Sequence, residues 1–211
     1  LRTVAGGTLA ADIDSTVLTN IQSSVSSIGS GTGAAMTFAP DDDNADGTVK
    51  SIVLAKVGTE TANTFLMVAN DNNVRHQITH DTDAIDWAYG FACGAGRVGS
   101  VVTFNGYLTS TPPTGKTIGM YAYNFVTPAW DLIKIITGAG AVDQTVTAKL
   151  LASHTGTGAS AGFVYIRFTT TGAQAGIILN VDQLVVDAQN LGQTVGYSEG
   201  AVWVDTASTN A

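Results

Sequence analysis

Charged side chains are scarce in this chain of 211 residues. Asp, Glu, Lys and Arg make up 12% of it, about half the usual share of roughly 25%. The 17 acidic residues outnumber the 9 basic ones, and the net charge is −8. A protein that binds DNA or RNA places Lys and Arg against phosphates, so this balance argues against nucleic acid as a partner.

Cysteine and long apolar runs are also lacking. Cys93 is the only cysteine, which excludes an intrachain disulfide and a zinc site built on cysteines. Its small and apolar neighbours indicate an ordinary core residue. No run of about 18 apolar residues marks a membrane span, and no basic stretch followed by an apolar one marks a secretory signal. From Leu1 in place of Met we expect a processed or partial chain.

Signatures of catalysis are missing as well. His154 lies in a glycine-containing segment, 153–158, but no Gly-x-Ser-x-Gly elbow surrounds a nucleophile there, and no Lys follows to meet a phosphate. Glutamate occurs only at Glu60 and Glu199, so the paired acids of glycoside hydrolysis are hard to nominate. We therefore predict no enzymatic activity, no catalytic residues and no cofactor.

Apolar residues alternate with polar or small ones through the middle of the chain. Ile85, Trp87, Tyr89 and Phe91 show this period of two, which is typical of a strand with one buried face. About eight to ten such segments, separated by polar turns, predict an all-β fold, an antiparallel jelly-roll-like β-sandwich at residues 49–190. The expected core residues are Trp87, Phe104, Ile118, Val164, Ile166, Phe168 and Leu179.

Residues 1–48 have a different pattern. Leu18, Ile21, Val25 and Ile28 have the spacing of a heptad seam, and a linker rich in Gly, Ser, Thr and Asp follows. β-branched residues at both seam positions favour trimers, so we expect a short helical or extended segment that docks or oligomerises, and a homotrimer. The alternative is one amphipathic helix packed on its own domain.

Residues 191–211 form a predicted connector. Gly192, Gly196 and Gly200 interrupt the chain after the last sandwich strand. The segment that follows has apolar groups on both faces and would aggregate if left bare at a sheet edge. We therefore expect Trp203 to be buried against a neighbouring chain or a downstream shaft.

An acidic turn gives a weak metal candidate. Asp42, Asn44 and Asp46, followed by Gly47, reproduce the first half of a calcium loop. Val53 stands where the bidentate carboxylate should be. The favoured interpretation is a solvated acidic turn without a high-affinity calcium site.

Two histidines on one predicted strand give a further metal candidate. His76 and His80 share a face of that strand, but four positions span about 13 Å, too far for two side chains to meet one ion easily. We expect them to be rim or core residues that satisfy backbone groups.

Aromatic residues offer a candidate binding surface. Trp130, Tyr107, Tyr121 and Tyr123 could form a platform on which sugar rings stack while Asn and Asp bind hydroxyls. The alternative is structural, with Trp130 fixing a strand corner.

An ordered series of short motifs resembles a jelly-roll-like module of structural proteins from tailed bacteriophages and prophages. The motifs are HQITH at 76–80, MYAYNF at 120–125, HTGTG at 154–158, VYIRF at 164–168, LNVDQ at 179–183 and GAVWVDT at 200–206. The resemblance covers about residues 50–206 and supplies no catalytic residues.

The resemblance implies an architectural role. On it we expect a virion structural protein, namely a fibre, appendage or capsid-decoration component, that is assembled in the host cytoplasm and partnered by itself and other virion proteins, with no membrane. The alternative function is a host-glycan-binding adhesin domain, which is compatible with the first.

Overall fold

The computed structural model describes residues 36–46, 48–50, 52–53, 56–108, 116–137 and 140–190. In these ranges the regular structure is almost entirely β-strand. The helical turns are short 3-10 segments: η2 (Asn44–Asp46), η3 (Phe65–Ala69), η4 (Ala152–His154) and η5 (Gly158–Ser160). Among the described residues, no helix has the length and apolar character needed to cross a membrane.

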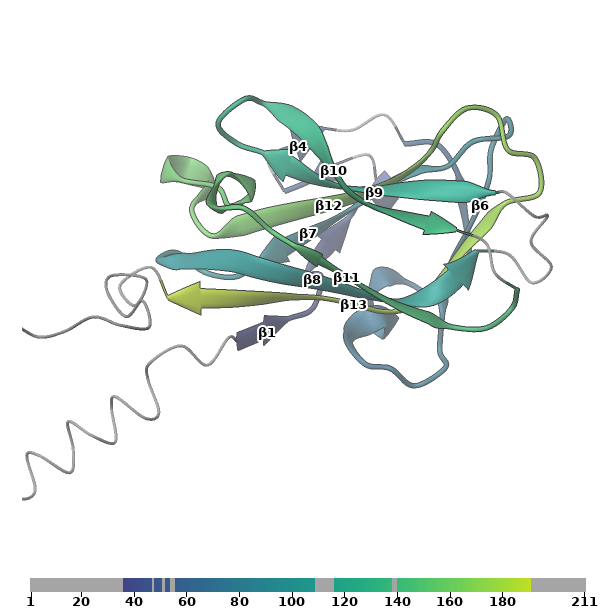
Figure 1. The fold of residues 1–211 in the computed structure, drawn as a ribbon, viewed down its shortest axis with the longest axis horizontal. Coiled ribbons are helices and arrows are strands. Elements are labelled where there is room, and N and C mark those ends of the chain that lie inside the picture. Colours follow the sequence, from purple (N-terminus) through teal and green to yellow (C-terminus); the bar gives the residue numbers. More distant parts are fainter. Residues whose placement is uncertain are drawn as a thin grey trace, which may run out of the picture. The chain divides into compact units, whose positions relative to one another are not determined.

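Two antiparallel sheets form the two layers of the domain (Figure 1). Sheet A has the order β11-β8-β13-β6-β5, with β1 also paired to β13, and sheet B has the order β10-β9-β12-β7-β2. The strands of sheet A are β1 (Met36–Phe38), β5 (Thr59–Ala62), β6 (His76–Thr79), β8 (Arg97–Leu108), β11 (Gln144–Lys149) and β13 (Ile178–Asn190). Those of sheet B are β2 (Asp42–Asp43), β7 (Asp86–Ala92), β9 (Thr117–Asn124), β10 (Ala129–Thr137) and β12 (Phe163–Thr170).

The order of the strands is that of a jelly roll. The strands from β6 to β13 divide into β6-β13-β8-β11 and β7-β12-β9-β10. Successive strands change sheets except β9 and β10, which pair with each other, and the last strands return beside the first. This is the double Greek key of a jelly roll. The predicted fold class is confirmed.

The core lies between the two sheets. The seven predicted core residues are all fully buried, and they belong to one cluster with residues from both sheets. Period-two alternation explains this, because every second residue of a strand points to the same face. Trp87 is among the largest of these buried side chains.

The sandwich begins earlier than the predicted boundary at residue 49. Two short strands inside the predicted linker belong to the sheets: β1 pairs with β13 in sheet A, and β2 pairs with β7 in sheet B. Strands β3 (Thr48–Val49) and β4 (Ile52–Val53) form a separate small hairpin. A two-residue or three-residue strand has too few positions to show a period, which is why the sequence pattern did not reveal β1 and β2.

The predicted oligomerisation seam of Leu18, Ile21, Val25 and Ile28, and the predicted connector residue Trp203, lie outside the described residues. Both predictions stay predictions.

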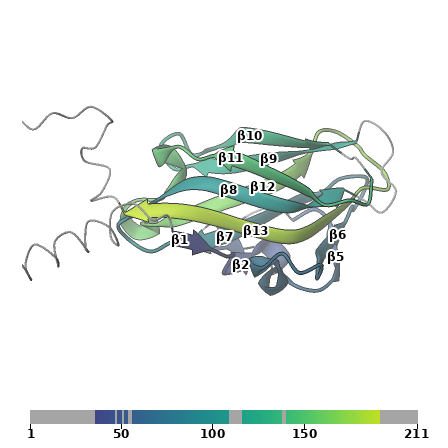
Figure 2. The ribbon, with the colours of Figure 1, turned by 60° about the horizontal axis from the view of Figure 1, so that its bottom comes forward.

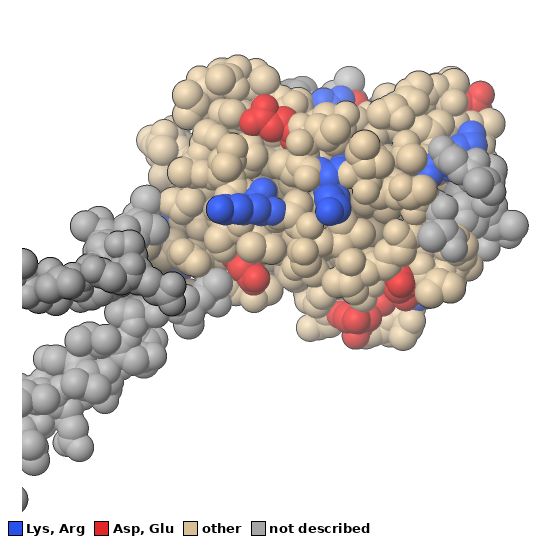
Figure 3. Space-filling view, viewed as in Figure 1, with Lys and Arg blue, Asp and Glu red and all other residues tan. Residues whose placement is uncertain are grey.

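Charge is sparse on the surface of the folded domain. Figure 3 shows one face, on which few basic and acidic side chains lie among many uncharged ones. Packing and backbone pairing therefore hold this domain together more than ion pairs do.

Candidate functional site

Aromatic side chains gather on the outer face of sheet B. In β9, Met120 and Ala122 point into the core, so Tyr121 and Tyr123 point outward. In β12, Ile166 and Phe168 are in the core in the same way, which places aromatic and basic residues of that strand on the outer face. Two sequence-predicted residues, Tyr121 and Tyr123, thus share a face.

Three aromatic residues form a row across the sheet. Trp130 of β10 stands directly opposite Tyr123 of β9, and their ring centroids are 5.2 Å apart. Tyr123 in turn lies 6.3 Å from Tyr165 of β12. Phe125 and Phe163 flank this aromatic row, each in ring contact with Tyr165. The angled ring pairs are favourable contacts in themselves, so the row is held in place before any ligand arrives.

A second row runs beside the first. Tyr121 pairs with Leu132 on one side and with Arg167 on the other. A Cβ atom at Gly119 would lie 2.5 Å from the Tyr121 ring, so this ring lies flat along its own strand over a residue without a side chain. Leu132 is 51% exposed and extends the apolar surface toward the edge of the sheet.

Arg167 and Asp86 supply the polar groups of the face. The Arg167 guanidinium donates two hydrogen bonds to the Asp86 carboxylate. The guanidinium also lies 5.4 Å from the centre of the Trp130 ring, within the range of a cation–π contact. The carboxylate thus orients the cation, and the cation orients the indole.

The β3–β4 hairpin closes the face on the side of β7. A Cβ atom at Gly90 would lie 2.9 Å from a Val49 methyl, so the glycine makes room for the hairpin. Val49, Ala88 and Tyr165 are fully buried there, with Ile52 packed beside them, so the Tyr165 ring supports the face from below. The part of the face that remains open lies over β9, β10 and β12, where Tyr121, Tyr123 and Trp130 are half-buried.

Tyr107 is not part of this face, which corrects the predicted set of four aromatic residues. It belongs to β8 of sheet A, where it pairs with Asn180 of β13. The Arg75 guanidinium covers its ring at 5.2 Å and is itself paired with Asp143. The sequence pattern gave the direction of each side chain within its strand, but it could not tell which sheet the strand joins.

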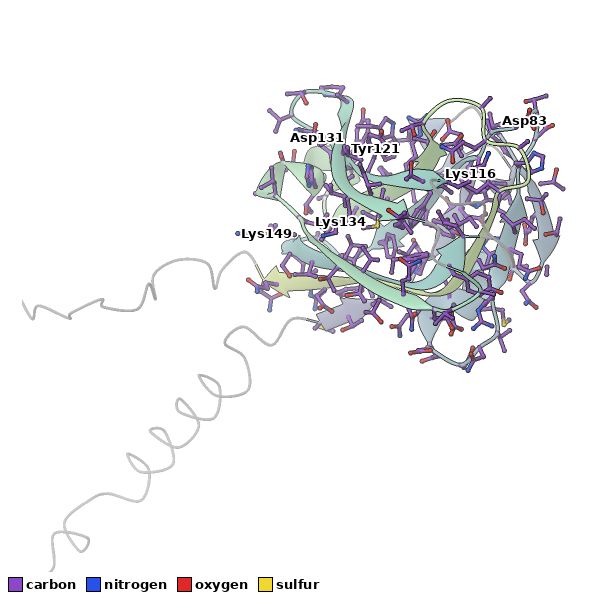
Figure 4. The ribbon with its side chains drawn as sticks, turned by 45° about the vertical axis from the view of Figure 1, so that its right-hand side comes forward. Asp83, Lys116, Tyr121, Asp131, Lys134 and Lys149 are labelled. Atoms are coloured by element: carbon purple, nitrogen blue, oxygen red, sulfur yellow. The ribbon has the colours of Figure 1, made fainter. Side chains whose placement is uncertain are left out.

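A polar group lies on the opposite side of sheet B from the aromatic face. The His154 Nδ1 atom accepts the backbone N–H of Leu151 at 3.1 Å, so Nε2 carries the proton and donates to Asp131 at 3.0 Å. Asn124 donates to the same carboxylate at 2.8 Å. These hydrogen bonds, from His154 first, lower the pKa of Asp131. On β10, Asp131 pairs with the core residue Ala122 of β9, so its side chain lies on the opposite face of sheet B from Tyr121; both residues are labelled in Figure 4.

The predicted calcium-type ligands point to different partners. Asp42 accepts the backbone N–H of Lys50 at 2.7 Å. Asn44 is fully buried and accepts the backbone N–H of Ala88 at 2.7 Å. The side chain of Asp46 is outside the described residues. The two described side chains therefore fasten the turn to its surroundings.

The two predicted histidines also separate. His76 is fully buried, whereas the side chain of His80 is 27% exposed and lies 3.8 Å from Asp83. The prediction that both rings satisfy backbone groups is wrong: His76 Nδ1 is hydrogen-bonded to the Tyr89 hydroxyl, and His76 Nε2 and His80 Nδ1 have no hydrogen-bond partner.

Sequence reasoning missed Arg167, Asp86, Phe125, Phe163 and Tyr165. The sequence of β12 contained a usable pattern, because Phe163, Tyr165 and Arg167 alternate with the core residues of that strand. An outward-facing aromatic pair on a central strand is a feature that could have been singled out. Asp86 could not have been found, because its partner is 81 residues away.

No family model matches the chain, and no curated protein matches it. Solved structures with a similar fold include a mutant of the family 29 carbohydrate-binding module CBM29-2, at 10% identity and a TM-score of 0.38, covering 72% of this chain and 92% of that one. A complex of the module TmCBM61 with beta-1,4-galactotriose has 9% identity and a TM-score of 0.39, with 75% and 92% covered.

A phage protein is also among the similar structures. The enzymatically active domain of tailspike protein 4 from bacteriophage CBA120 has 12% identity and a TM-score of 0.35, and the match covers 64% of this chain but 18% of the tailspike chain. At these identities and TM-scores the similarities carry no argument about function. The candidate site stands on its own geometry.

Proposed function

We propose that this domain is a glycan-binding module and that it binds saccharides on the open part of the outer face of sheet B. The observation that carries the proposal is the half-buried ring pair of Trp130 and Tyr123, which packs against the fully buried Tyr165 of the neighbouring strand and is thereby fixed. Binding on this face is the adhesin function considered above as the alternative to virion architecture.

The chemistry of the face suits a saccharide. A sugar ring has apolar C–H faces that stack on aromatic rings, and hydroxyls around its edge that need hydrogen-bonding partners. Trp130 and Tyr121 offer half-buried rings, and Leu132 adds exposed apolar surface. Arg167 and Asp86 place donors and acceptors beside the rings.

Preorganisation favours affinity on such a surface. The rings of the aromatic row already contact one another, and the Arg167–Asp86 pair holds the guanidinium against Trp130. A ligand that binds here has few side chains to immobilise, so it loses less conformational entropy than on a face of free side chains.

A glycan array followed by calorimetry tests the proposal. The array identifies a ligand for the full chain, and Trp130→Ala and Tyr121→Ala should each weaken its binding by at least about tenfold, which corresponds to about 1.4 kcal/mol. Tyr107→Ala is the matched control, because Tyr107 is also half-buried on an outer face but belongs to sheet A. Circular dichroism should show that all three variants fold.

Two results contradict the proposal. One is the absence of any ligand on an array of bacterial and plant glycans. The other is a ligand whose affinity falls with Tyr107→Ala and not with the two variants in sheet B.

Assembly into a virus particle stays a prediction that is compatible with glycan binding. The residues expected to carry it are the seam at 18–28 and Trp203, and the resemblance to phage structural modules motivates it. The absence of enzymatic activity is likewise a prediction from the sequence.

A further inference from the structure

A second cluster of polar side chains lies inside the sandwich, away from the aromatic face. His76 is on β6 and Glu60 on the neighbouring strand β5, both in sheet A, while Asp43 is on β2 of sheet B. Strands β2 and β5 are the last strands of their sheets, and both are labelled along the same margin of the domain in Figure 2. The cluster therefore joins the two sheets at one edge.

The ligand-type atoms of these residues are close together. His76 Nε2 is 3.5 Å from Glu60 Oε1 and 3.9 Å from Asp43 Oδ2. One donor atom of each residue lies within 4.8 Å of the other two. Around a tetrahedral ion with bonds of 2.0–2.2 Å, ligand atoms are separated by roughly 3.3–3.6 Å. The His76–Glu60 distance already lies in this range, and the His76–Asp43 distance exceeds it by a few tenths of an ångström.

The His76 ring has an unpartnered nitrogen aimed into the cluster. His76 is fully buried, and its Nε2 atom has no hydrogen-bond partner. Its other nitrogen, Nδ1, is 2.9 Å from the Tyr89 hydroxyl. In the tautomer whose Nδ1–H donates to that oxygen, the free lone pair is on Nε2, the atom that lies nearest the two carboxyl groups. This outer hydrogen bond is the kind that orients histidines which ligate metals.

The remaining contacts fix Asp43. Its Oδ1 atom accepts the backbone N–H of Ala45 at 3.0 Å, and Oδ2 accepts the Trp87 indole N–H at 3.4 Å. Asp43 is 3% exposed, whereas the side chain of Glu60 is 24% exposed. Glu60 therefore forms the rim of the cluster, and solvent reaches the site past it.

The charged groups at the cluster are the two carboxyl groups of Asp43 and Glu60 and the nearby cation Lys56. Burial raises the pKa of Asp43 and of Glu60, and the charge of Asp43 raises that of Glu60 further. Lys56, the nearby cation, donates to the Ala45 carbonyl and lies over the Trp87 ring.

We propose that Asp43, Glu60 and His76 bind one divalent transition-metal ion of the Zn²⁺ type, which links the edge strands of the two sheets. An imidazole nitrogen with two carboxylates suits such an ion, whereas Ca²⁺ takes six to eight oxygen ligands. Water at the Glu60 rim completes the coordination. The ion neutralises both carboxylates and ties the short strands β2 and β5 to β6.

Zinc titration of the full chain tests this inference. After dialysis against a chelator, calorimetry should show one Zn²⁺ bound per chain, and Zn²⁺ should raise the melting temperature. Glu60→Gln keeps the size of the rim residue and should weaken binding at least about tenfold. His80→Gln is the matched control, because His80 lies just beyond β6 with its own carboxylate neighbour, and it should bind like the wild type.

A direct readout needs no variant. In a ¹⁵N-histidine-labelled wild-type chain, Zn²⁺ should shift the Nε2 resonance of His76 and leave those of His80 and His154 in place. The inference is overturned if His76 does not respond, if Glu60→Gln binds Zn²⁺ as tightly as the wild type, or if Ca²⁺ in equal amount displaces the Zn²⁺. The aromatic face is not involved, so this result is independent of glycan binding.

Discussion

At the scale of single residues, Cys93 shows how burial decides reactivity. It follows β7 and is fully buried, as its sequence neighbourhood predicts. Burial raises the pKa of its thiol to about 12, and the thiolate is the reactive form. At pH 8 only about one molecule in ten thousand would have Cys93 in the thiolate form.

We therefore expect Cys93 to resist thiol reagents in the folded protein. Ellman's reagent at pH 8 should release no colour over an hour from the native chain and one equivalent after addition of guanidinium. A native chain that reacts within seconds would show that Cys93 is accessible.

Asp131 gives a prediction about pH. Hydrogen bonds from His154 and Asn124 lower its pKa in the folded state, so the unfolded chain binds this proton more readily. The resulting stabilisation is present above the unfolded pKa of about 3.9 and is lost as pH falls through the lower folded pKa. Asp131→Asn should reduce the stability at pH 7, and the difference from the wild type should shrink at pH 3.

Urea denaturation at both pH values measures that difference. Asp81→Asn serves as the control, since Asp81 is exposed in a turn, and it should change stability little at either pH. A loss at Asp131 that is the same at pH 7 and pH 3 would rule out the carboxylate as its cause.

At the scale of elements, the turns depend on two glycines with similar backbone angles and different surroundings. Gly96, between β7 and β8, has φ +84, and a Cβ atom there would meet nothing within 4 Å. Gly162, just before β12, has φ +79, and a Cβ atom would lie 2.1 Å from the Gly94 carbonyl oxygen. Backbone contact therefore adds to conformational strain only at Gly162.

Alanine at these two positions should separate the two costs. Gly96→Ala should lose about 1–2 kcal/mol, the cost of the left-handed conformation. Gly162→Ala should lose at least about 3 kcal/mol, because the turn that donates the Cys93 N–H to the Gly162 carbonyl must also move. Chemical denaturation measures the loss of stability in both variants. Equal losses would show that the backbone near Gly94 moves to accept a Cβ atom at Gly162 without a further cost.

At the scale of the whole molecule, the predicted homotrimer is open to a direct test. A chain that begins at Gly33 keeps β1, which starts at Met36, but lacks Leu18, Ile21, Val25 and Ile28. If the seam associates as a heptad pattern does, light scattering should give a smaller mass for this chain than for the full one. The double substitution Ile21→Ser and Val25→Ser in the full chain should also lower the mass. If the mass stays the same in both experiments, the seam does not take part in assembly.

The sequence by itself determined the fold class and the core. Strict alternation around Trp87, Phe104 and Ile166 has one physical solution, a strand with one buried face, and a series of such strands without helices packs as a sandwich. The outward direction of Tyr121 and Tyr123 followed from the same period. The burial of Cys93 was predicted from its small, apolar neighbours.

Only the tertiary structure decided which side chains meet. Strand order places Trp130 and Tyr123 together and puts Tyr107 on the other sheet, and no local pattern carries that order. Asp43, Glu60 and His76 come from three strands, two of them at sheet edges, so their approach depends on how the sheets are stacked. Period and composition act along the chain over a few residues, whereas both sites proposed for this protein depend on contacts across strands and sheets.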